Sequence, residues 1–344
     1  MSCGSGQQPQ AGKDGEAATG GKSLSEVLME VGRSAENVFY SFLELLSDTL
    51  GFTAKSTTKK DEVGDYFNSL GMKLGQASEE LEEVAKNSKV EGEGAKDSLL
   101  NKVIKEAVDA AKAALNILKT NVNLLGTIGD NNVVGYANNV VGSGTQADET
   151  ELKKAFNSLK EIVKAATDSG VQELKAGTIT LQVNGGADNK DGAKILATSG
   201  NNPAATDAGK AAVILSTVSG EEILKSIIAS QESDAQLSDN ATADTSAISF
   251  AKGGSDAHLA GSTDAKAAAV AGGIALRSLV KTGKLAAGAA DNVTGGGKEV
   301  QGLGVTAVNK LLVAVEDIIK KTVKNVLKTA KEKIDEARTP KLAG

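Results

Sequence analysis

Residues of the types that catalyse reactions are rare in this chain and lie far apart. The 344 residues include one cysteine, Cys3, and one histidine, His258, which lies in a polar stretch. If Cys3 belongs to a tether, no Cys-His pair can form, and a Ser-His-Asp triad would have to use His258. Sites that bind a metal through several His or Cys residues cannot be assembled. We therefore expect no enzyme of these types and no resident metal or cofactor.

Paired carboxylates remain open as a catalytic device, because 44 Asp and Glu residues are present. A dense group is formed by Glu79, Glu80, Glu82 and Glu83. These residues follow the polar face of a predicted helix, which is typical of a solvated surface.

Three segments resemble fragments of binding motifs. Residues 15–23 end in Gly-Gly-Lys-Ser like a phosphate-binding loop, but the spacing is one residue too long and no strand precedes it. Residues 142–147 imitate a dinucleotide-binding turn without a βαβ setting. Residues 189–192 imitate half of a calcium loop, but the closing glutamate is replaced by Thr198. The first segment lies in the predicted tether, and the second is better explained as a coincidence. For the third, a weak cation contact stays open, but a solvated loop is the better interpretation.

A cluster of lysines marks the C-terminal half of the last predicted helix. Its members are Lys320, Lys321, Lys324, Lys328, Lys331 and Lys333. Positive charge near a helix C-terminus is favourable because it complements the helix dipole. The same charge could also contact anionic lipid headgroups or a polyanionic host surface. We expect a structural role first and a ligand-contact role second.

The location of Cys3 near the start of the sequence is more informative than the fact that the chain has a single cysteine. Small residues flank it, and residues 4–22 contain hardly any apolar side chain, so this segment should be disordered. One interpretation is an unimportant thiol in a flexible tail. The other is the cysteine of a bacterial lipoprotein, acylated after signal cleavage, with residues 1–22 as a tether whose typical reach is about 25 Å.

The elements that would position any site are helices, and a long one is predicted over about 305–337. Its apolar residues recur at steps of three or four: Val308, Leu312, Val315, Ile319, Val323, Val326, Ala330 and Ile334. This spacing puts them on one face of a nearly straight helix of roughly 50 Å. Such a stripe is not stable in water alone, so other helices must pack along it.

Similar stripes predict further helices, and alternating residues predict two short strands. The helices are expected over about 24–46, 61–85, 97–118, 149–167, 207–230 and 264–290. A capping box at Ser23 and Glu26 begins the first, and Ser219-Gly220 is a break point in the fifth. Strands are expected at 178–183 and 247–251.

Composition sets the fold class. Hydrophobic residues make up 40% and charged residues 24% of the chain, which is enough to bury a core. We predict a mainly α protein: an elongated bundle of long helices with Gly/Asn-rich loops and at most a few short strands. One domain should cover residues 23–338, followed by a tail at 339–344. Its long surface loops are expected at 126–147, 170–206, 231–262 and 291–304.

Composition also excludes several functions. Aromatic residues are only 3% of the chain and tryptophan is absent, which disfavours aromatic-lined sugar or nucleotide pockets. The net charge of -6 argues against a dedicated nucleic-acid binder. No run of about 18 apolar residues exists that could cross a membrane.

Four segments resemble a known family. Residues 274–286 resemble the invariant-region helix of VlsE-like proteins, and residues 42–52, 63–67 and 308–310 resemble the same group. These are the variable large proteins of Borrelia, surface lipoproteins of relapsing-fever spirochaetes. The resemblance extends over nearly the whole chain.

The resemblance implies an anchor and a distal face. Family members carry lipid on the mature N-terminal cysteine, which corresponds to Cys3, and stand on the outer membrane. Met1 and Ser2 depart from that mature start. Loops between the helices would form the distal, variable surface, and switching between members would evade host antibody.

Our first functional hypothesis is therefore a non-enzymatic surface antigen whose partners are outer-membrane lipid and host antibodies. The second is an adhesin, or a binder of plasminogen, complement or glycosaminoglycan, that uses the lysine cluster or the loops. The third is an enzyme built on paired carboxylates. A weak homodimer through helix faces also stays open.

Overall fold

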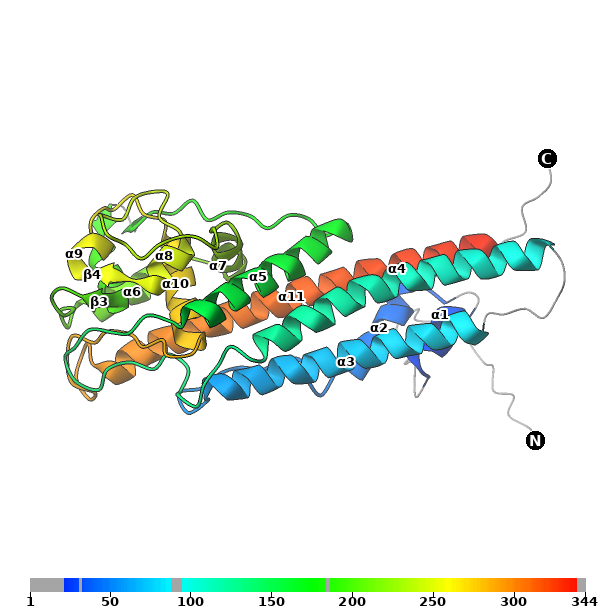
Figure 1. Cartoon of the computed structure of the whole chain (residues 1–344), viewed down its shortest axis with the longest axis horizontal. Helices are drawn as coiled ribbons and strands as arrows, with labels where there is room; N and C mark the ends of the chain where they lie inside the picture. The colour runs from blue at the N-terminus through cyan, green and yellow to red at the C-terminus, as the bar shows by residue number, and fades with distance from the viewer. Residues whose placement is uncertain (1–21, 31–32, 88–94, 184–185, 339–344) are drawn as a thin grey trace, which may run out of the picture.

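The computed structural model describes residues 22–30, 33–87, 95–183 and 186–338, and its backbone is an elongated bundle of helices (Figure 1). The expected fold class is confirmed. The longest element is α11 (Gly297–Arg338), whose 42 residues span roughly 60 Å. Every member of its predicted apolar stripe is buried except Val326, which is partly buried against the core.

α11 begins earlier than predicted, so the expected loop at 291–304 is shorter. The expected loop includes Gly302 and Gly304, yet Val300 and Ala307 are buried and extend the apolar stripe of the helix. Gly304 packs directly on Gly135, where a side chain would not fit. The close contact with Gly135, rather than a need for chain flexibility, explains why residue 304 is a glycine.

Three other long helices form the bundle with α11, and two of them pack along it, as predicted. α3 (Lys60–Asn87) and α4 (Ala95–Leu125) run antiparallel side by side, and α4 packs on α11. α5 (Glu149–Asp168) packs on both α4 and α11. In α5 the buried residues include Leu152, Phe156, Leu159, Ile162 and Val163, which is the face expected from the sequence.

The predicted N-terminal helix is wrong in its extent, because it is two helices. α1 (Leu24–Met29) begins at the predicted capping box, in which Ser23 and Glu26 bind each other's backbone N–H groups. α2 (Ala35–Leu45) begins at a second cap, where the Ser34 hydroxyl accepts the Asn37 N–H at 3.3 Å. α2 packs on α11 and α1 packs on α3.

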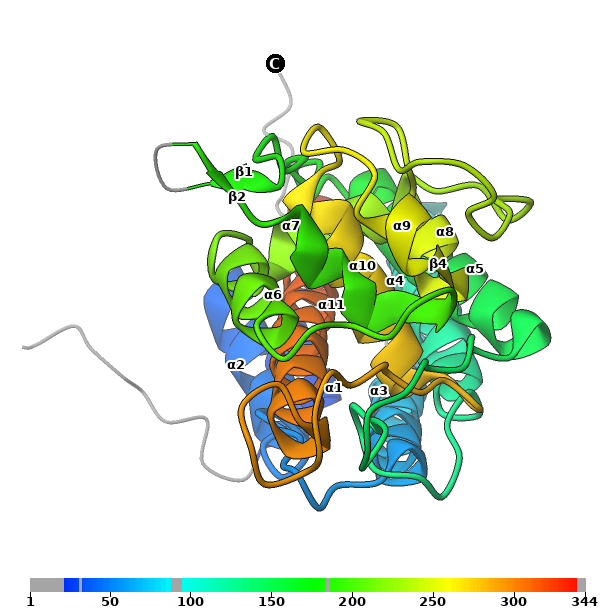
Figure 2. The same cartoon turned by 90° about the vertical axis from the view of Figure 1, so that its left-hand side faces the viewer.

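The other end of the bundle is rich in loops and short helices (Figure 2). These are η1 (Lys190–Leu196), α6 (Asp207–Ser216), α7 (Gly220–Ile228), α8 (Ala247–Lys252), α9 (Asp256–Leu259) and α10 (Ala267–Leu279). The predicted break at Ser219 is confirmed, since its side chain caps α7. All 13 residues of α10 are buried, so this helix is the core of the loop-rich end.

Strands are few and short, and the two predicted ones are mostly wrong. β1 (Gln182–Val183) pairs with β2 (Ala187–Asp188), so only the end of the 178–183 prediction is strand. β3 (Ala197–Ser199) pairs in parallel with β4 (Gly254–Ser255). The predicted strand at 247–251 is α8 instead.

The Ser246 hydroxyl caps α8 at the Ser249 N–H, and Ala247, Ile248, Phe250 and Ala251 bury one helical face. The predicted helix at 264–290 also stops early, at Leu279, because the following backbone bonds to other segments.

The described chain starts and finishes at the same end of the bundle. The Arg338 guanidinium donates to the Met29 carbonyl at 2.7 Å, so the end of α11 is fixed to α1. The loop-rich end lies at the opposite end of the long axis (Figure 1). Within the described ranges, none of the helices combines the length and apolar character needed to cross a bilayer.

Candidate functional site

The loop-rich end is organised by a buried arginine. Arg277 is 0% exposed and lies in the last turn of α10. Its Nε donates to the carbonyl of Ala251 at 2.6 Å, and its Nη2 to those of Leu196 at 3.2 Å and Phe250 at 3.4 Å. Nη1 donates to the Lys284 carbonyl at 3.4 Å. One side chain therefore joins the ends of η1 and α8 to the segment that follows α10.

The acceptors of Arg277 have a common electrostatic character. Phe250 and Ala251 lie in the last turn of α8, where unpaired carbonyls carry partial negative charge. Burial lowers the pKa of Arg277 to about 9, so the guanidinium stays charged at neutral pH. Carbonyl dipoles thus take the place of a carboxylate partner.

A buried lysine holds the same segment from the other side. Lys60, the first residue of α3, is 0% exposed, and its Nζ donates to the carbonyls of Val280 at 2.8 Å and Gly283 at 2.7 Å. Burial lowers the pKa of Lys60 to about 8, opposed by the charge of Asp130 and assisted by that of Arg277. We call residues 280–285, which these two cations hold, the hub turn.

The hub turn contains a strained residue. Thr282 has φ +61°, a left-handed conformation that β-branched residues rarely adopt. Its N–H donates to Asp130 Oδ2 at 2.9 Å and its hydroxyl donates to the Gln146 carbonyl at 3.0 Å. Although burial pushes the pKa of Asp130 up, the N–H groups of Thr282 and Asn132 outweigh it and keep this pKa below its usual value. These bonds hold the strained conformation in place.

The 126–147 segment is fixed to the hub turn through its backbone. Thr145 and Lys284 exchange two N–H···O bonds of 2.9 and 3.0 Å. Gly142 and Ala287 exchange two more, each of 3.0 Å. The segment at 142–147 that imitates a dinucleotide-binding turn is therefore paired through its backbone with the hub turn and with Ala287, and its resemblance to that turn is a coincidence, as expected.

The same kind of anchor recurs along the bundle. Polar side chains of α11 donate to carbonyls near the C-terminal ends of shorter helices: Lys310 to Leu215 and Val218, Asn325 to Ser169, and Arg338 to Met29. None of α1, α5 and α6, the helices held this way, carries a basic residue in its own last turn. Donor groups on α11 therefore complement the negative, C-terminal ends of these helix dipoles.

The six predicted ligand-contact lysines do not form one patch. Lys331 is 1% exposed and its Nζ lies 2.5 Å from Asp335, while Lys320 lies 2.5 Å from Glu316. Lys321, Lys324, Lys328 and Lys333 are exposed. Lys333 lies nine positions after Lys324, which places the two on opposite sides of the helix.

Other sequence-predicted sites also receive a structural explanation. Asp191, in the calcium-like segment, pairs with Lys194 and Lys210. Burial pushes its pKa up, but these two lysines outweigh it and lower the pKa below the usual value. His258 is partly buried in α9 and its N–H donates to the Ser255 hydroxyl at 3.2 Å. Cys3 lies outside the described residues, and the phosphate-loop-like segment lies outside them up to residue 21.

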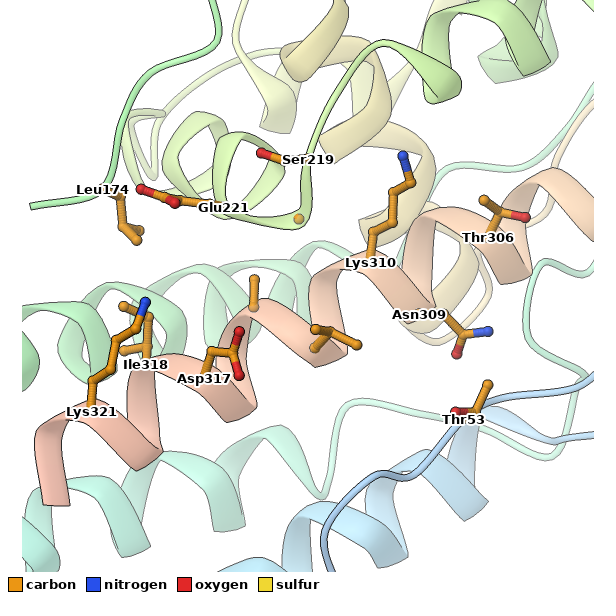
Figure 3. A pocket seen from close by; sticks show the side chains of 13 residues that line it. Thr53, Leu174, Ser219, Glu221, Thr306, Asn309, Lys310, Asp317, Ile318 and Lys321 are labelled. Atoms are coloured by element: carbon orange, nitrogen blue, oxygen red, sulfur yellow. The ribbon is translucent and has the colours of Figure 1, made fainter. Parts of the chain in front are cut away.

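A cleft of about 600 Å³ opens beside the middle of α11 (Figure 3). Leu174, Ala314 and Ile318 are buried in its walls, and Val313 is 59% exposed. No group of three or more His, Cys, Asp or Glu side chains in the described ranges is placed to hold a metal.

The polar groups of this cleft are mostly occupied by structural bonds. Asn309 binds the backbone of Ala54 through both its oxygen and its nitrogen, at 2.8 and 2.9 Å. Ser219 caps α7, and Glu221 accepts the Lys175 N–H at 2.9 Å. The arrangement therefore stabilises the joint between α7 and α11.

Comparison with known proteins identifies relatives along the whole chain. The sequence pattern of a family described as Borrelia lipoprotein matches residues 35–334. The chain is 69% identical over 335 residues to Variable large protein 7 of Borrelia hermsii, covering 97% of this chain and 90% of that protein. It is 59% identical to Variable large protein 21 of the same organism, covering 99% and 93%.

A solved structure shares the fold. The crystal structure of Lyme disease variable surface antigen VlsE of Borrelia burgdorferi matches with a TM-score of 0.61 at 23% identity. The match covers 87% of this chain and 97% of that one.

Proposed function

Because the chain belongs to the Borrelia lipoprotein family, we propose that it is a variable antigen of the outer surface. In this proposal lipid on Cys3 holds the protein to the outer membrane, and the loop-rich end faces host antibodies. Replacing one family member by another then changes the exposed loops while the helical bundle persists. No catalytic step is part of this function.

The way in which the loop-rich end is anchored carries the proposal. Arg277 and Lys60 bind it through main-chain carbonyls, which every residue type supplies. The side chains of the anchored segments are therefore not needed as hydrogen-bond acceptors. An antigen that must change its surface without losing its fold requires such separation of backbone anchoring from side-chain identity.

The exposure of the loops supports the same proposal. In residues 231–246, all of which the structure describes, only Ala241 is buried. Substitutions at exposed positions away from specific contacts usually change stability by less than about 0.5 kcal/mol. This segment can therefore vary at little cost to folding.

The position of the chain ends supports an anchor opposite the loops. Met29 and Arg338 bind each other at the end of the bundle that lies away from α6, α8 and α9 (Figure 1). A lipid on Cys3 would therefore attach at this end. Mass spectrometry of the native protein's N-terminus tests the anchor: acyl groups on Cys3 are expected, and a free thiol there would contradict it.

Antibody binding tests the distal face. Exposed residues of the 231–246 loop, such as Gln231, Glu232, Gln236 and Asp239, are replaced together by alanine, and antiserum against the unchanged protein is titrated on intact cells that display the variant. We expect a marked loss of binding with an unchanged melting temperature. The matched control replaces Glu79, Glu82, Glu83 and Gln76 on the exposed side of α3. Equal or larger loss of cell-surface antibody binding in this control would contradict a distal antigenic face.

A further inference from the structure

A second groove, unrelated to the antigenic face, lies between α2 and α11. Its volume is about 450 Å³, within the range of small-molecule sites. Its lining residues are Phe39, Leu43, Ser47 and Leu50 from the N-terminal side and Asp317, Lys320, Lys321 and Lys324 from α11. One wall is thus apolar and the opposite wall is mainly lysine.

The apolar wall is continuous with the protein core. Phe39, Leu43 and Leu50 are each partly buried and pack against the buried cluster of the bundle. The remaining exposed part of these side chains faces the groove. Lysine side chains add to this surface, because their methylene stems are apolar while the ammonium reaches water.

The lysine wall carries charge that the protein does not neutralise. Lys320 is held by Glu316, which also accepts the Gly51 N–H at 2.9 Å. Lys321 and Lys324 form no ion pair with any described carboxylate, and Lys324 Nζ instead lies 5.7 Å from the Phe39 ring centroid. With Lys320 paired to Glu316, Lys321 and Lys324 still outnumber Asp317 and leave the groove positive, although the chain as a whole is acidic.

We propose that this groove binds a long-chain fatty acid. The carboxylate binds the ammonium groups of Lys324 and of Lys321, which lies at the border with the cleft of Figure 3, and the alkyl chain lies along Phe39, Leu43 and Leu50. Charge complementarity selects an anionic head, and the apolar wall selects an alkyl tail. The inference does not depend on the antigenic role and assigns the two unpaired lysines to a ligand of defined chemistry.

A fluorescence titration of the full chain with 11-(dansylamino)undecanoic acid tests the proposal, with oleate as competitor below its micelle concentration. Saturable binding of one probe per chain, displaced by oleate, is expected. The double variant Lys321→Glu/Lys324→Glu should bind at least about tenfold more weakly. Ser47→Phe, which fills the groove from an exposed position, should weaken binding as well.

Controls separate the groove from general surface charge and from unfolding. Lys328→Glu/Lys333→Glu changes the charge of α11 equally, outside the groove, and should keep affinity within about twofold. Circular dichroism melting confirms that each variant is folded. Absence of saturable binding, equal loss in both double variants, or equal displacement by dodecyltrimethylammonium would each overturn the proposal.

Discussion

Lys60 and Arg277 hold one turn of the chain from two sides without a shared carboxylate. Lys60 donates to the carbonyls of Val280 and Gly283, and Arg277 donates to that of Lys284. Both cations are 0% exposed. Removal of either cation takes a charged donor from these carbonyls, so the hub turn is the point where the loop-rich end is most sensitive to substitution.

Lys60→Met should destabilise the protein, because it leaves the Val280 and Gly283 carbonyls without their donor. We expect a loss of about 1–3 kcal/mol in the free energy of unfolding, measured by urea titration at pH 7. Lys55→Met is the control, since Lys55 is exposed. Equal effects of the two substitutions would show that the buried ammonium does not hold the hub turn.

The effect of Lys60 should depend on pH. Its pKa is about 8 in the folded protein and near the ordinary value of 10.5 when unfolded. Between these values the unfolded state binds more protons, so the contribution of Lys60 to stability rises with pH. The stability difference between the unchanged protein and Lys60→Met should therefore grow by about 1–2 kcal/mol from pH 7 to pH 9.5. A constant or shrinking difference would contradict the lowered pKa.

Thr282 should tolerate asparagine better than valine. Asparagine adopts positive φ readily, whereas valine keeps the strain of a β-branched residue and loses the hydroxyl bond to Gln146. We expect Thr282→Asn to be more stable than Thr282→Val by about 1–2 kcal/mol in thermal or urea unfolding. If valine is the more stable, the left-handed conformation of this turn is wrong.

Two glycines of α11 should respond in opposite directions to alanine. A Cβ on Gly304 would lie 2.5 Å from Gly135 Cα and from Ser278 Oγ, so Gly304→Ala should cost about 1–3 kcal/mol. A Cβ on Gly302 would meet nothing within 4 Å, so Gly302→Ala should gain about 0.5–1 kcal/mol through helix propensity. Melting temperatures of the two variants check this, and a similar change in both would argue against the close contact of α11 with Gly135.

The long helices are predictable because the sequence of each one is sufficient to indicate its structure. The apolar stripes of α3, α4, α5 and α11 repeat over many turns, and long repeats specify both the helix and its buried face. The short elements lack such repeats. At residues 247–251 five residues fit a strand as well as a helix, and the Ser246 cap together with packing on α10 decides for the helix.

The anchors of the loop-rich end were missed for a different reason. Arg277 is the single charged residue of α10, and a lone charge inside an apolar run is a usable signal of a buried anchor. Lys60 gives no such signal, since it lies among charged residues at the start of α3. Its burial depends on a turn more than 200 residues away in the chain, between Val280 and Gly283, which a local pattern cannot reveal.

The length of α11 has a consequence for molecules standing side by side. Its roughly 60 Å separate the joined chain ends from the loops. If copies are attached at the joined ends and crowd together, their flanks shield one another and only the tips stay within reach of a large immunoglobulin. Dense coverage would then conceal the constant helical walls by steric exclusion alone.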